Sequence, residues 1–451
     1  MKIKKIYFKK HNVFGTHSIR FGDPIPRIAF LVGNNGSGKT RVLDTIYQLL
    51  HQPHSYDSDF EIDLILLLSD EEKKLFSVEE NEIIYNVKKE SGGNSNQVTY
   101  TSGRSIRLNM QVLSKIVYST VEVNFNEPNI TSVTSRNIDQ ESKPKEKSQN
   151  LSIEIPQLLV DIKSLDDSER GKWVEKNKGA KGVDIPDNLG TRLQRFTNAF
   201  HKIYDGTKTF QDIKNEANSK KIIFTDALGN EISLNDLSTG EKQIIYRVGY
   251  ILKNLGTIHG GIILIDEPEI SLHPIWQTKL KDFLLEVFRE VDVQIIIATH
   301  SPYIFKNLQE PTEVCIKVDR TEPESKKVSL IFPRVPYNPS VNLINYLAYG
   351  IPSELLHIEL YTLLQIREKR DKITNSKPGK NDGIEDWLQD SAGGNIPIKQ
   401  TFTKSGKSSP TRETIMTWIR NKIHHSDEPS RPLFVETDLR QSIDEMIRLL
   451  R

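Results

Sequence analysis

Hydrophobic and polar residues alternate near the start of the chain and then give way to an apolar run. Apolar side chains stand at Ile3, Ile6 and Phe8, and the run Ile28–Val32 follows. Period-two alternation is typical of half-buried strands, and a short continuous run is typical of a fully buried one. The pattern therefore predicts two or three strands within residues 1–32, followed by a helix over 40–50, where apolar residues recur at helical spacing.

Strands and helices alternate again in the second half of the chain. We expect, in order, a strand at 221–225, a hairpin at Leu228-Gly229-Asn230, a helix from 239, a strand at 261–265, a helix at 274–290 and a strand at 293–298. Such alternation favours a mostly parallel sheet covered by helices on both faces. The predicted fold class is therefore α/β.

The remaining segments have other patterns. Residues 131–150 are rich in Ser, Lys, Glu and Gln, so apolar burial cannot offset their ordering entropy, and we expect a mobile insertion there. Two helices are expected at 156–175 and 188–216. Beyond 338 the pattern predicts helices without intervening strands, at 342–372, 411–424 and 436–451. No heptad run is long enough for a coiled-coil arm.

These patterns divide the chain into four predicted regions. They are the N-terminal half of a nucleotide-binding domain at 1–130, an insertion that is partly disordered and partly helical at 131–218, the C-terminal half of that domain at 219–337, and an α-helical region at 338–451.

Composition narrows the function classes. The chain has 61 Lys and Arg against 60 Asp and Glu, a net charge of +1, so no global basic field draws it to nucleic acid. Its single cysteine, Cys315, excludes an internal disulfide and a four-thiolate zinc site. No apolar stretch is long enough to span a bilayer, and the first ten residues lack the apolar core of a signal peptide. We therefore expect a cytoplasmic protein.

The sequence GNNGSGKT lies between the predicted strand 28–32 and the predicted helix. It matches GxxxxGK[ST], in which the backbone N–H groups of the glycine turn face phosphate oxygens, Lys39 neutralises phosphate charge and Thr40 holds Mg²⁺. Strand, glycine loop and helix are the context that this motif requires. The predicted ATP-binding residues here are Gly33, Asn34, Asn35, Gly36, Ser37, Gly38, Lys39 and Thr40.

Two further motifs carry chemistry. The apolar strand GIILID ends in two acids, of which Asp266 can reach the Mg²⁺ shell while Glu267 is placed to orient or deprotonate a water molecule. The sequence LSTGE places a hydroxyl and a glycine at a helix start, which suits either an anion or a simple helix cap. Its candidate nucleotide-binding residues are Ser238, Thr239, Gly240 and Glu241.

The order GNNGSGKT, LSTGEKQ, IILIDEPE, SLHP and IATHS resembles the ABC superfamily of P-loop ATPases, in the branch of SMC, Rad50 and RecF-like proteins. The resemblance implies an ABC-type ATPase that hydrolyses ATP with Mg²⁺. It assigns the signature to 238–241, and the switch histidine that touches the γ-phosphate to His300. It also implies a homo-oligomer in which Ser238 and Gly240 of one subunit close over the nucleotide held by another. For the glutamine expected in the Q-loop, the candidates are Gln48 and Gln111.

The C-terminal third, with YLAYGIPSELLHIELY and MTWIRNKIHH, resembles compact ATPases of bacterial anti-phage systems, in particular PtuA, the ATPase subunit of Septu systems, which is also found with certain retrons. That resemblance implies an oligomeric scaffold that holds and controls an HNH nuclease. Contact with nucleic acid would then come through the complex, and no membrane is involved.

Two alternatives stay open. Arg420 and His425 match the Arg-x4-His signature of HEPN ribonucleases, which would place an RNA-cutting site in the same chain. Residues five apart lie about 140° apart on a helix, so the two would flank a cleft, and His424 is the one-turn neighbour of Arg420. Helix-capping or partner contacts are the favoured explanation of Arg420, His424 and His425. The other alternative is a RecF- or SMC-like DNA-repair ATPase. A zinc site from His357, His424 and His425 is disfavoured because adjacent histidines on a helix point in different directions.

Overall fold

The chain forms an N-terminal unit, Met1–Lys327, and a C-terminal unit, Val328–Arg451. The computed structural model describes residues 1–51, 59–77, 79–90, 93–100, 105–106, 115–120, 130–134, 136, 138–139, 145–147, 150–177, 179, 185–204, 206–215, 219–330, 332, 337–374, 384–391, 398–402, 411–424 and 433–451. Among these residues no helix combines the length and apolar character needed to cross a bilayer.

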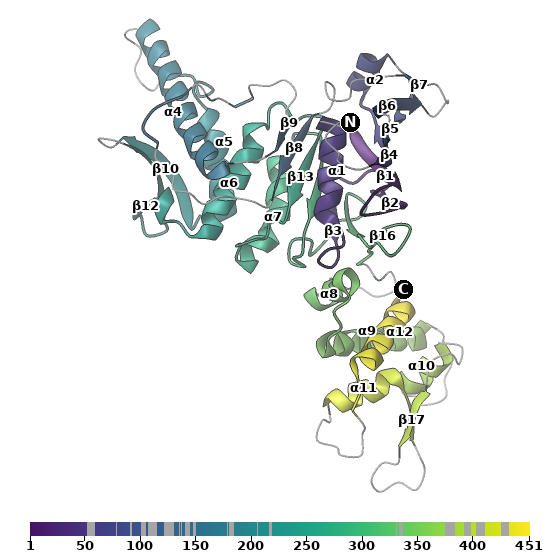
Figure 1. Cartoon of the computed structure of the whole chain (residues 1–451). Helices are drawn as coiled ribbons and strands as arrows, with labels where there is room; N and C mark the ends of the chain where they lie inside the picture. Colours follow the sequence, from purple (N-terminus) through teal and green to yellow (C-terminus); the bar gives the residue numbers. More distant parts are fainter. Residues whose placement is uncertain are drawn as a thin grey trace. The chain divides into compact units, whose positions relative to one another are not determined.

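The N-terminal unit is built on a seven-stranded sheet of order β16-β15-β3-β14-β13-β8-β9 (Figure 1). β3, β14, β13, β8, β9 and β15 run parallel, and β16 pairs antiparallel with β15. The strands are β3 (Ile28–Val32), β8 (Ile116–Ser119), β9 (Lys145–Lys147), β13 (Gly261–Asp266), β14 (Val293–Ala298), β15 (Glu313–Lys317) and β16 (Lys326–Lys327). The predicted α/β class with a mostly parallel sheet is confirmed.

The central strands are mostly apolar because helices cover both faces of the sheet. Every residue of β3, β13 and β14 is buried. One face packs against α1 (Lys39–His51) in a common core. On the other face, Ile265 lies with residues of α6 (Thr239–Lys253) and α7 (Pro274–Val287). A strand that is buried on both sides has no alternation of polar and apolar residues, which is why these strands form continuous apolar runs in the sequence.

A six-stranded antiparallel sheet of order β2-β1-β4-β5-β6-β7 packs on the outer side of α1. Its elements are β1 (Lys2–Lys10), β2 (His17–Arg20), β4 (Phe60–Leu67), β5 (Glu82–Glu90), β6 (Gly93–Tyr100) and β7 (Ser105–Ile106), with α2 (Asp70–Phe76) between β4 and β5. Ile3, Ile6 and Phe8 turn inward, as their alternation predicts. β4 to β7 extend this sheet beyond the predicted strands.

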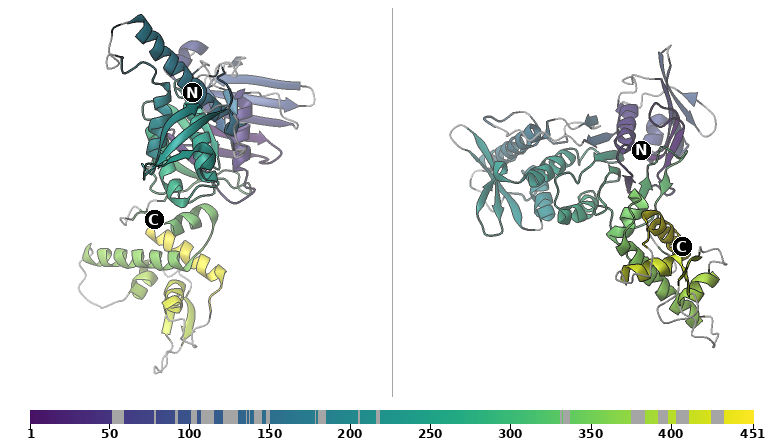
Figure 2. Two further views of the ribbon diagram at one scale, coloured as in Figure 1. Left: turned by 90° about the vertical axis from the view of Figure 1, so that its left-hand side faces the viewer. Right: turned by 60° about the horizontal axis from the view of Figure 1, so that its bottom comes forward.

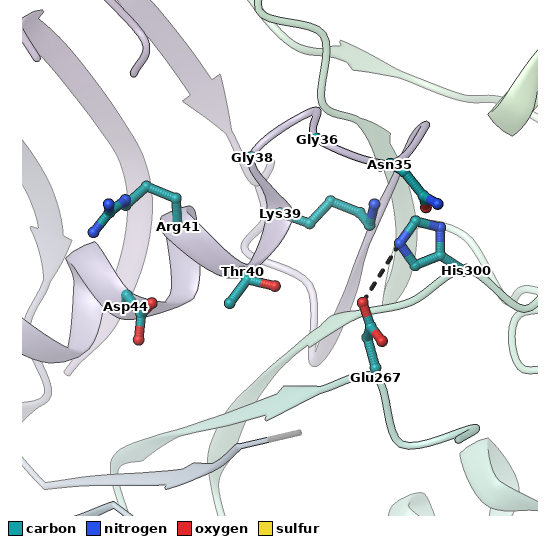
Figure 3. Close-up of a pocket in the computed structure, with 9 residues that line it drawn as sticks. All are labelled: Asn35, Gly36, Gly38, Lys39, Thr40, Arg41, Asp44, Glu267 and His300. Carbon is teal, nitrogen blue, oxygen red and sulfur yellow. Dashed lines mark ion pairs between the residues drawn. The ribbon is translucent and has the colours of Figure 1, made fainter. Parts of the chain in front are cut away.

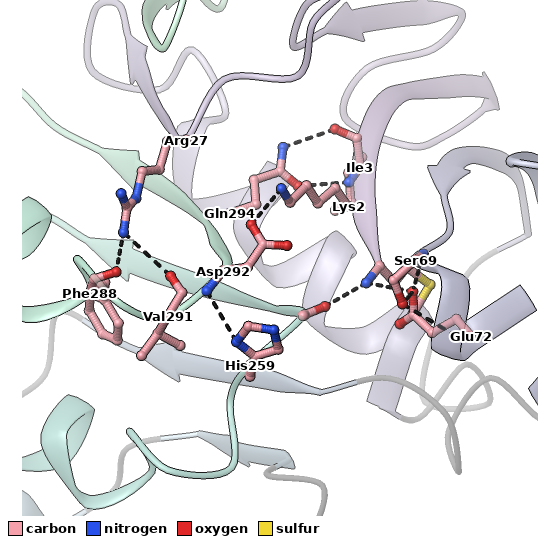
Figure 4. Close-up of polar contacts among 12 residues, drawn as sticks. Lys2, Ile3, Arg27, Ser69, Glu72, His259, Phe288, Val291, Asp292 and Gln294 are labelled. Atoms are coloured by element: carbon pink, nitrogen blue, oxygen red, sulfur yellow. Dashed lines mark hydrogen bonds and ion pairs between the residues drawn. The ribbon is translucent and has the colours of Figure 1, made fainter.

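A buried glutamine ties the two sheets together (Figure 4). The Gln294 side chain in β14 accepts a hydrogen bond from the main-chain N–H of Ile3 at 2.7 Å and donates to the main-chain oxygen of Ile3 at 2.9 Å. An amide can satisfy both backbone groups at once, so the one polar residue of VQIIIA is buried without an unpaired group.

A third layer contains α4 (Leu151–Lys176), α5 (Arg192–Tyr204) and the antiparallel sheet β10 (Lys208–Asn215), β11 (Lys220–Asp226) and β12 (Glu231–Ser233), which leads through η2 (Leu234–Asp236) into α6 (Figure 2). The predicted helix 188–216 is wrong at its C-terminal end. Gly206, at φ 71°, follows the helix, and Phe210 and Ile213 pair with β11 as part of a strand. Lys145–Lys147 of the predicted insertion forms β9.

The C-terminal unit contains α8 (Val341–Tyr349), α9 (Glu354–Thr374), α10 (Ile384–Ser391), α11 (Ile415–His424) and α12 (Glu436–Leu450), with the strand pair β17 (Ile398–Phe402) and β18 (Thr411–Thr414). The predicted helix 342–372 is split at Gly350, whose φ of 72° ends α8. The expectation of no strands here is also wrong. Residues 411–414 extend and pair with β17, and the Thr414 hydroxyl accepts the N–H of Thr417 at the start of α11.

Candidate nucleotide-binding site

The phosphate loop joins β3 to α1, which begins at Lys39. Gly33, Gly36 and Gly38 have φ values of 140°, 75° and 102°, which side-chain-bearing residues rarely adopt. A Cβ on Gly38 would lie 2.6 Å from the ring of Phe14. Glycine is therefore required here both for the backbone turn and for close packing.

The Lys39 side chain folds back over the loop. Its Nζ donates to the main-chain oxygens of Gly33 at 2.9 Å and Asn34 at 3.2 Å. Burial lowers the pKa of Lys39, while Glu267, Asp266 and Glu269 favour its charged form. The ammonium is thus held by weak carbonyl acceptors at a place where a phosphate oxygen would be a stronger partner.

A cavity of about 570 Å³ opens beside this loop (Figure 3). That volume is in the range of small-molecule sites. Its lining comes from the loop, the first turns of α1 and the ends of two strands: Asn35, Gly36, Gly38, Lys39, Thr40, Arg41, Asp44, Glu267 and His300. Of the predicted loop residues, Gly33, Asn34 and Ser37 shape the turn without lining the cavity.

Asp266 ends β13 next to the start of α1. Thr40 Oγ1 donates to Asp266 Oδ1 at 3.2 Å, so the two predicted magnesium ligands do lie together. Burial raises the pKa of Asp266 to about 6, and the hydrogen bond from Thr40 opposes that shift. Two hard oxygen atoms at this spacing fit Mg²⁺, which binds through one or two carboxylates and hydroxyls alongside phosphate oxygens.

Glu267 and His300 face each other across the cavity (Figure 3), with His300 Nε2 3.5 Å from Glu267 Oε1. They meet because β13 and β14 are adjacent parallel strands whose carboxyl ends share one sheet edge. Burial and nearby Lys39 lower the pKa of His300, so a neutral imidazole faces the carboxylate at pH 7. Glu267 has a φ of 42°, a strained conformation for a non-glycine residue.

Within one chain, the LSTGE segment serves as a helix cap. The Ser238 hydroxyl accepts the N–H of Glu241, and Glu241 Oε2 accepts the N–H of Ser238 at 2.8 Å. Lys208 forms an ion pair with Glu241. A Cβ on Gly240 would lie 2.3 Å from the main-chain oxygen of Ser271, so this glycine is needed for packing. Residues 238–241 do not line the cavity, and their contact with a nucleotide on another subunit stays a prediction.

Several neighbours of the site were not among the predicted site residues. Arg41 and Asp44 line the cavity from α1. Glu269 accepts a hydrogen bond from the main-chain N–H of His300, and Arg247 donates to the main-chain oxygen of Asp266 at 2.8 Å. Of these neighbours, only Asp44 could have been expected from the sequence, because it follows Thr40 by four residues and so lies on the same helix face.

Of the two Q-loop candidates, the structure describes only Gln48. Gln48 lies near the C-terminal end of α1 and is absent from the cavity lining, and Gln111 lies outside the described residues.

Among the candidate residues of the C-terminal unit, Arg420 is held by internal contacts. Arg420 Nη1 donates to Asn421 Oδ1 at 2.9 Å, and its guanidinium lies 6.0 Å from the centre of the Tyr361 ring. His424 is exposed at the end of α11, and His425 lies outside the described residues.

The zinc alternative finds no support in the part of the chain that the structure describes. No three His, Cys, Asp or Glu side chains there form a metal-binding group. His357 is fully buried, Nε2 lies 2.9 Å from Ser442 Oγ, and burial lowers its pKa to about 3.

Two solved structures illustrate the structural likeness. The SMC head domain from Thermotoga maritima covers 73% of this chain and 100% of its own, with a TM-score of 0.41 and 16% identity. The Smc head domain with an extended coiled coil, bound to the C-terminal domain of ScpA and derived from Pyrococcus furiosus, covers 73% of this chain and 96% of its own, with a TM-score of 0.42 and 16% identity.

Curated relatives match shorter segments. Septu protein PtuA of Bacillus thuringiensis is 34% identical over 113 residues, which are 23% of this chain and 27% of PtuA. Retron Vc95 probable ATPase of Vibrio cholerae serotype O1 biovar El Tor is 39% identical over 85 residues, 17% of this chain and 16% of the relative. Retron Ec83 probable ATPase of Escherichia coli is 35% identical over 86 residues, again 17% and 16%. The resemblance to Septu and retron ATPases is confirmed, and the chain spans at most about a quarter of each relative's length.

A family model covers much more of the chain. It matches residues 28–306, from β3 through the phosphate loop, Asp266 and Glu267 to the segment after His300. This span is more than half of the 451 residues. The chain therefore belongs to the family described as AAA domain, putative AbiEii toxin, Type IV TA system.

Proposed function

We propose that the protein is the ATP-hydrolysing subunit of an anti-phage defence complex, in which it forms an oligomeric scaffold that holds and controls a partner nuclease of the HNH type. The observation that carries the ATPase part is the convergence of Lys39, Thr40, Glu267 and His300 on one cavity beside Asp266. Sequence similarity to Septu protein PtuA and to two retron ATPases supports the defence role.

In the proposed reaction the phosphate loop binds the triphosphate through its N–H groups and through Lys39, which exchanges its carbonyl partners for phosphate oxygens. Thr40 and Asp266 would hold Mg²⁺. When bound, this ion neutralises phosphate charge. Asp266 is nearly inaccessible to solvent, so its negative charge is strongly favoured when a cation lies beside it.

Glu267 is the proposed general base. Its carboxylate faces the cavity next to His300, and the strained backbone fixes its direction. The neutral imidazole of His300 donates or accepts a hydrogen bond without adding a charge of its own. Together they would orient a water molecule toward the γ-phosphate, with Glu267 taking its proton.

The assembly step rests on the signature residues. In one subunit Ser238 and Gly240 do not line the cavity. We infer that a second copy presents them to the nucleotide, so that ATP binding brings subunits together and hydrolysis separates them.

The test is the variant Glu267→Gln. It should bind ATP and accumulate as an ATP-dependent oligomer, with hydrolysis reduced by about 100-fold or more because the general base is lost. Light scattering with and without ATP and phosphate release measure the two effects. Glu290→Gln, at an exposed position outside the cavity, is the matched control. Unchanged hydrolysis in Glu267→Gln would remove the role assigned to this residue.

The nuclease part has a separate test. Co-expression with an HNH protein encoded beside this chain should yield a complex that survives purification, and nuclease activity in that complex should depend on ATP. A chain that purifies alone from such co-expression, with the HNH protein free, would contradict the scaffold proposal and leave the ATPase proposal standing.

A further inference from the structure

A third carboxylate, Asp44, lies on the proposed magnesium side of the cavity. It follows Thr40 by four residues on α1, so the two side chains lie on the same helix face. Both line the cavity together with Glu267 (Figure 3). Asp266 lies beside Thr40 through their 3.2 Å hydrogen bond, so Thr40 has Asp266 as its partner across the sheet edge and Asp44 one turn along its own helix.

A tyrosine of the neighbouring strand orients Asp44. Tyr118 lies in β8, the parallel neighbour of β13, and its hydroxyl hydrogen-bonds with Asp44. Burial raises the pKa of Tyr118, and the charges of Asp266 and Asp44 add to the shift, so the phenol stays a neutral donor. Its ring is fixed against Tyr47 of α1, with ring centres 5.6 Å apart.

The acids of this corner lie beside cations as well. Lys39 and Arg41 line the same cavity, and Arg247 donates a hydrogen bond to the main-chain oxygen of Asp266 at 2.8 Å. Carboxylate and hydroxyl oxygens are the ligands that Mg²⁺ prefers.

Among the residues that the structure describes, no glutamine lines the cavity, and Gln48, one turn beyond Asp44 on α1, lies outside its lining.

From this arrangement we propose that Asp44 is a metal-positioning residue that completes the oxygen surroundings of Mg²⁺ together with Thr40 and Asp266. The inference rests on the proposed function, because it concerns the ion that accompanies ATP. Its competitor is a structural role, in which Asp44 only accepts the hydrogen bond of Tyr118.

The variant Asp44→Asn separates the two roles. Asparagine keeps an oxygen for Tyr118 and removes the negative charge. Binding of a fluorescent, non-hydrolysable ATP analogue to the full chain is measured in EDTA and over a Mg²⁺ titration. We expect the half-saturating Mg²⁺ concentration to rise by about 10- to 100-fold, the usual cost of losing a metal-orienting partner. Metal-free binding should be unchanged or tighter, because a charge that repels phosphate is gone.

Asp282→Asn is the matched control, because Asp282 is an exposed acid of α7 that does not line the cavity. A Mg²⁺ midpoint in Asp44→Asn equal to that of Asp282→Asn overturns the inference. So does an equal loss of analogue binding with and without Mg²⁺, which is the result of a structural role. If Asp44→Asn does not fold, Asp44→Ser, smaller and also neutral, gives the same reading. A wild-type chain that binds no analogue at all would instead contradict the proposed function.

Discussion

The nucleotide pocket of the N-terminal unit and the Arg420 region of the C-terminal unit both contain charged residues singled out in the sequence, yet the structure treats them differently. In the pocket, Lys39, Glu267 and His300 come from three separate segments and face one cavity. In the C-terminal unit, Arg420 is engaged by its sequence neighbour Asn421 and by the ring of Tyr361. The first arrangement leaves polar groups directed at a ligand, whereas the second directs them at the protein itself.

The two regions also differ in the energetic cost of burying their titratable side chains. Asp266 is a buried acid, near like charges, whose pKa is raised to about 6, and Glu267 beside it has a strained backbone. Such costs persist at sites where a ligand offsets them. His357 is equally buried, but it is neutral and hydrogen-bonded to Ser442 in a helical core. A buried titratable residue therefore indicates a ligand-binding site only where its side chain faces a cavity.

The largest expected effect tests the pocket directly. Replacing Lys39 with Ala removes the buried ammonium, and a charge-assisted hydrogen bond is worth about 1.5–3 kcal/mol, so ATP affinity should fall by about 10- to 100-fold or more. Equilibrium binding of a fluorescent ATP analogue measures it. Lys172→Ala, at an exposed position on α4, is the control. If the ATP affinity of Lys39→Ala were unchanged, the pocket would not differ from the C-terminal unit as a ligand-binding site.

The second prediction concerns the loop backbone. Gly38→Ala should weaken nucleotide binding and lower the unfolding temperature, because its Cβ would meet Phe14 at 2.6 Å and φ is 102°. Gly229→Ala is a matched control with a φ of 85° and no atom within 4 Å of the added Cβ, so it carries the conformational strain of about 1–3 kcal/mol without the clash. Thermal unfolding should rank Gly38→Ala as the less stable. Equal decreases in unfolding temperature would show that the Phe14 ring moves aside without cost.

The nucleotide pocket and the C-terminal unit also differ in how much of each could be predicted from the sequence. The central strands and the residues at their ends were predictable because parallel strands buried on both faces leave continuous apolar runs, and because a phosphate loop tolerates few residue types. Glu267 and His300 each follow such a run, so their meeting at one sheet edge followed from the topology.

Other features depended on tertiary contacts that no local pattern carries. Residues 208–215 are a strand because they pair with β11, and 411–414 because they pair with β17. β6 has a mostly polar sequence and β7 has only two residues, so their pairing partners decide their state. Asp44 has an ordinary position in a helix. Its place at the cavity edge depends on the packing of α1 beside the paired strands β8 and β13.

The third prediction uses pH to sharpen the comparison. The pKa of His357 is lowered to about 3 in the folded unit, against about 6.5 in an unfolded chain. The unfolded state therefore binds the proton first as pH falls. Stability contributed by the neutral ring is complete above about pH 6.5 and is lost between there and pH 3, by about 1.4 kcal/mol per pH unit. Urea unfolding of the C-terminal unit, followed by tryptophan fluorescence at pH 7 and pH 5, measures the slope.

His357→Gln provides the control for that slope. It removes the titrating ring, so the variant should start less stable at pH 7 and lose less stability on acidification than the native chain. An identical pH slope in both proteins would assign the acid sensitivity to other groups, such as His11 in the N-terminal unit, whose pKa burial lowers to about 4.

The smallest expected effect is that of Arg420→Ala. Its contact with the Tyr361 ring and its hydrogen bond to Asn421 predict a loss of about 0.5–1 kcal/mol in the free energy of unfolding, with ATP binding unchanged. Arg440→Ala is a close match, because the guanidinium of Arg440 on α12 lies 5.9 Å from the centre of the Tyr346 ring on α8. Similar small losses in both variants would show that Arg420 behaves as an ordinary packing residue.

The same variant decides between the scaffold and the in-cis ribonuclease. Under the scaffold proposal, the purified chain leaves single-stranded RNA intact, and Arg420→Ala affects nuclease activity only when a co-expressed HNH partner is present. If the purified chain cuts RNA, and if Arg420→Ala and His425→Ala abolish the cleavage while Arg440→Ala does not, the ribonuclease alternative replaces the scaffold. Arg420 would then need a substrate that competes with Tyr361 and Asn421 for its guanidinium, since both now engage it.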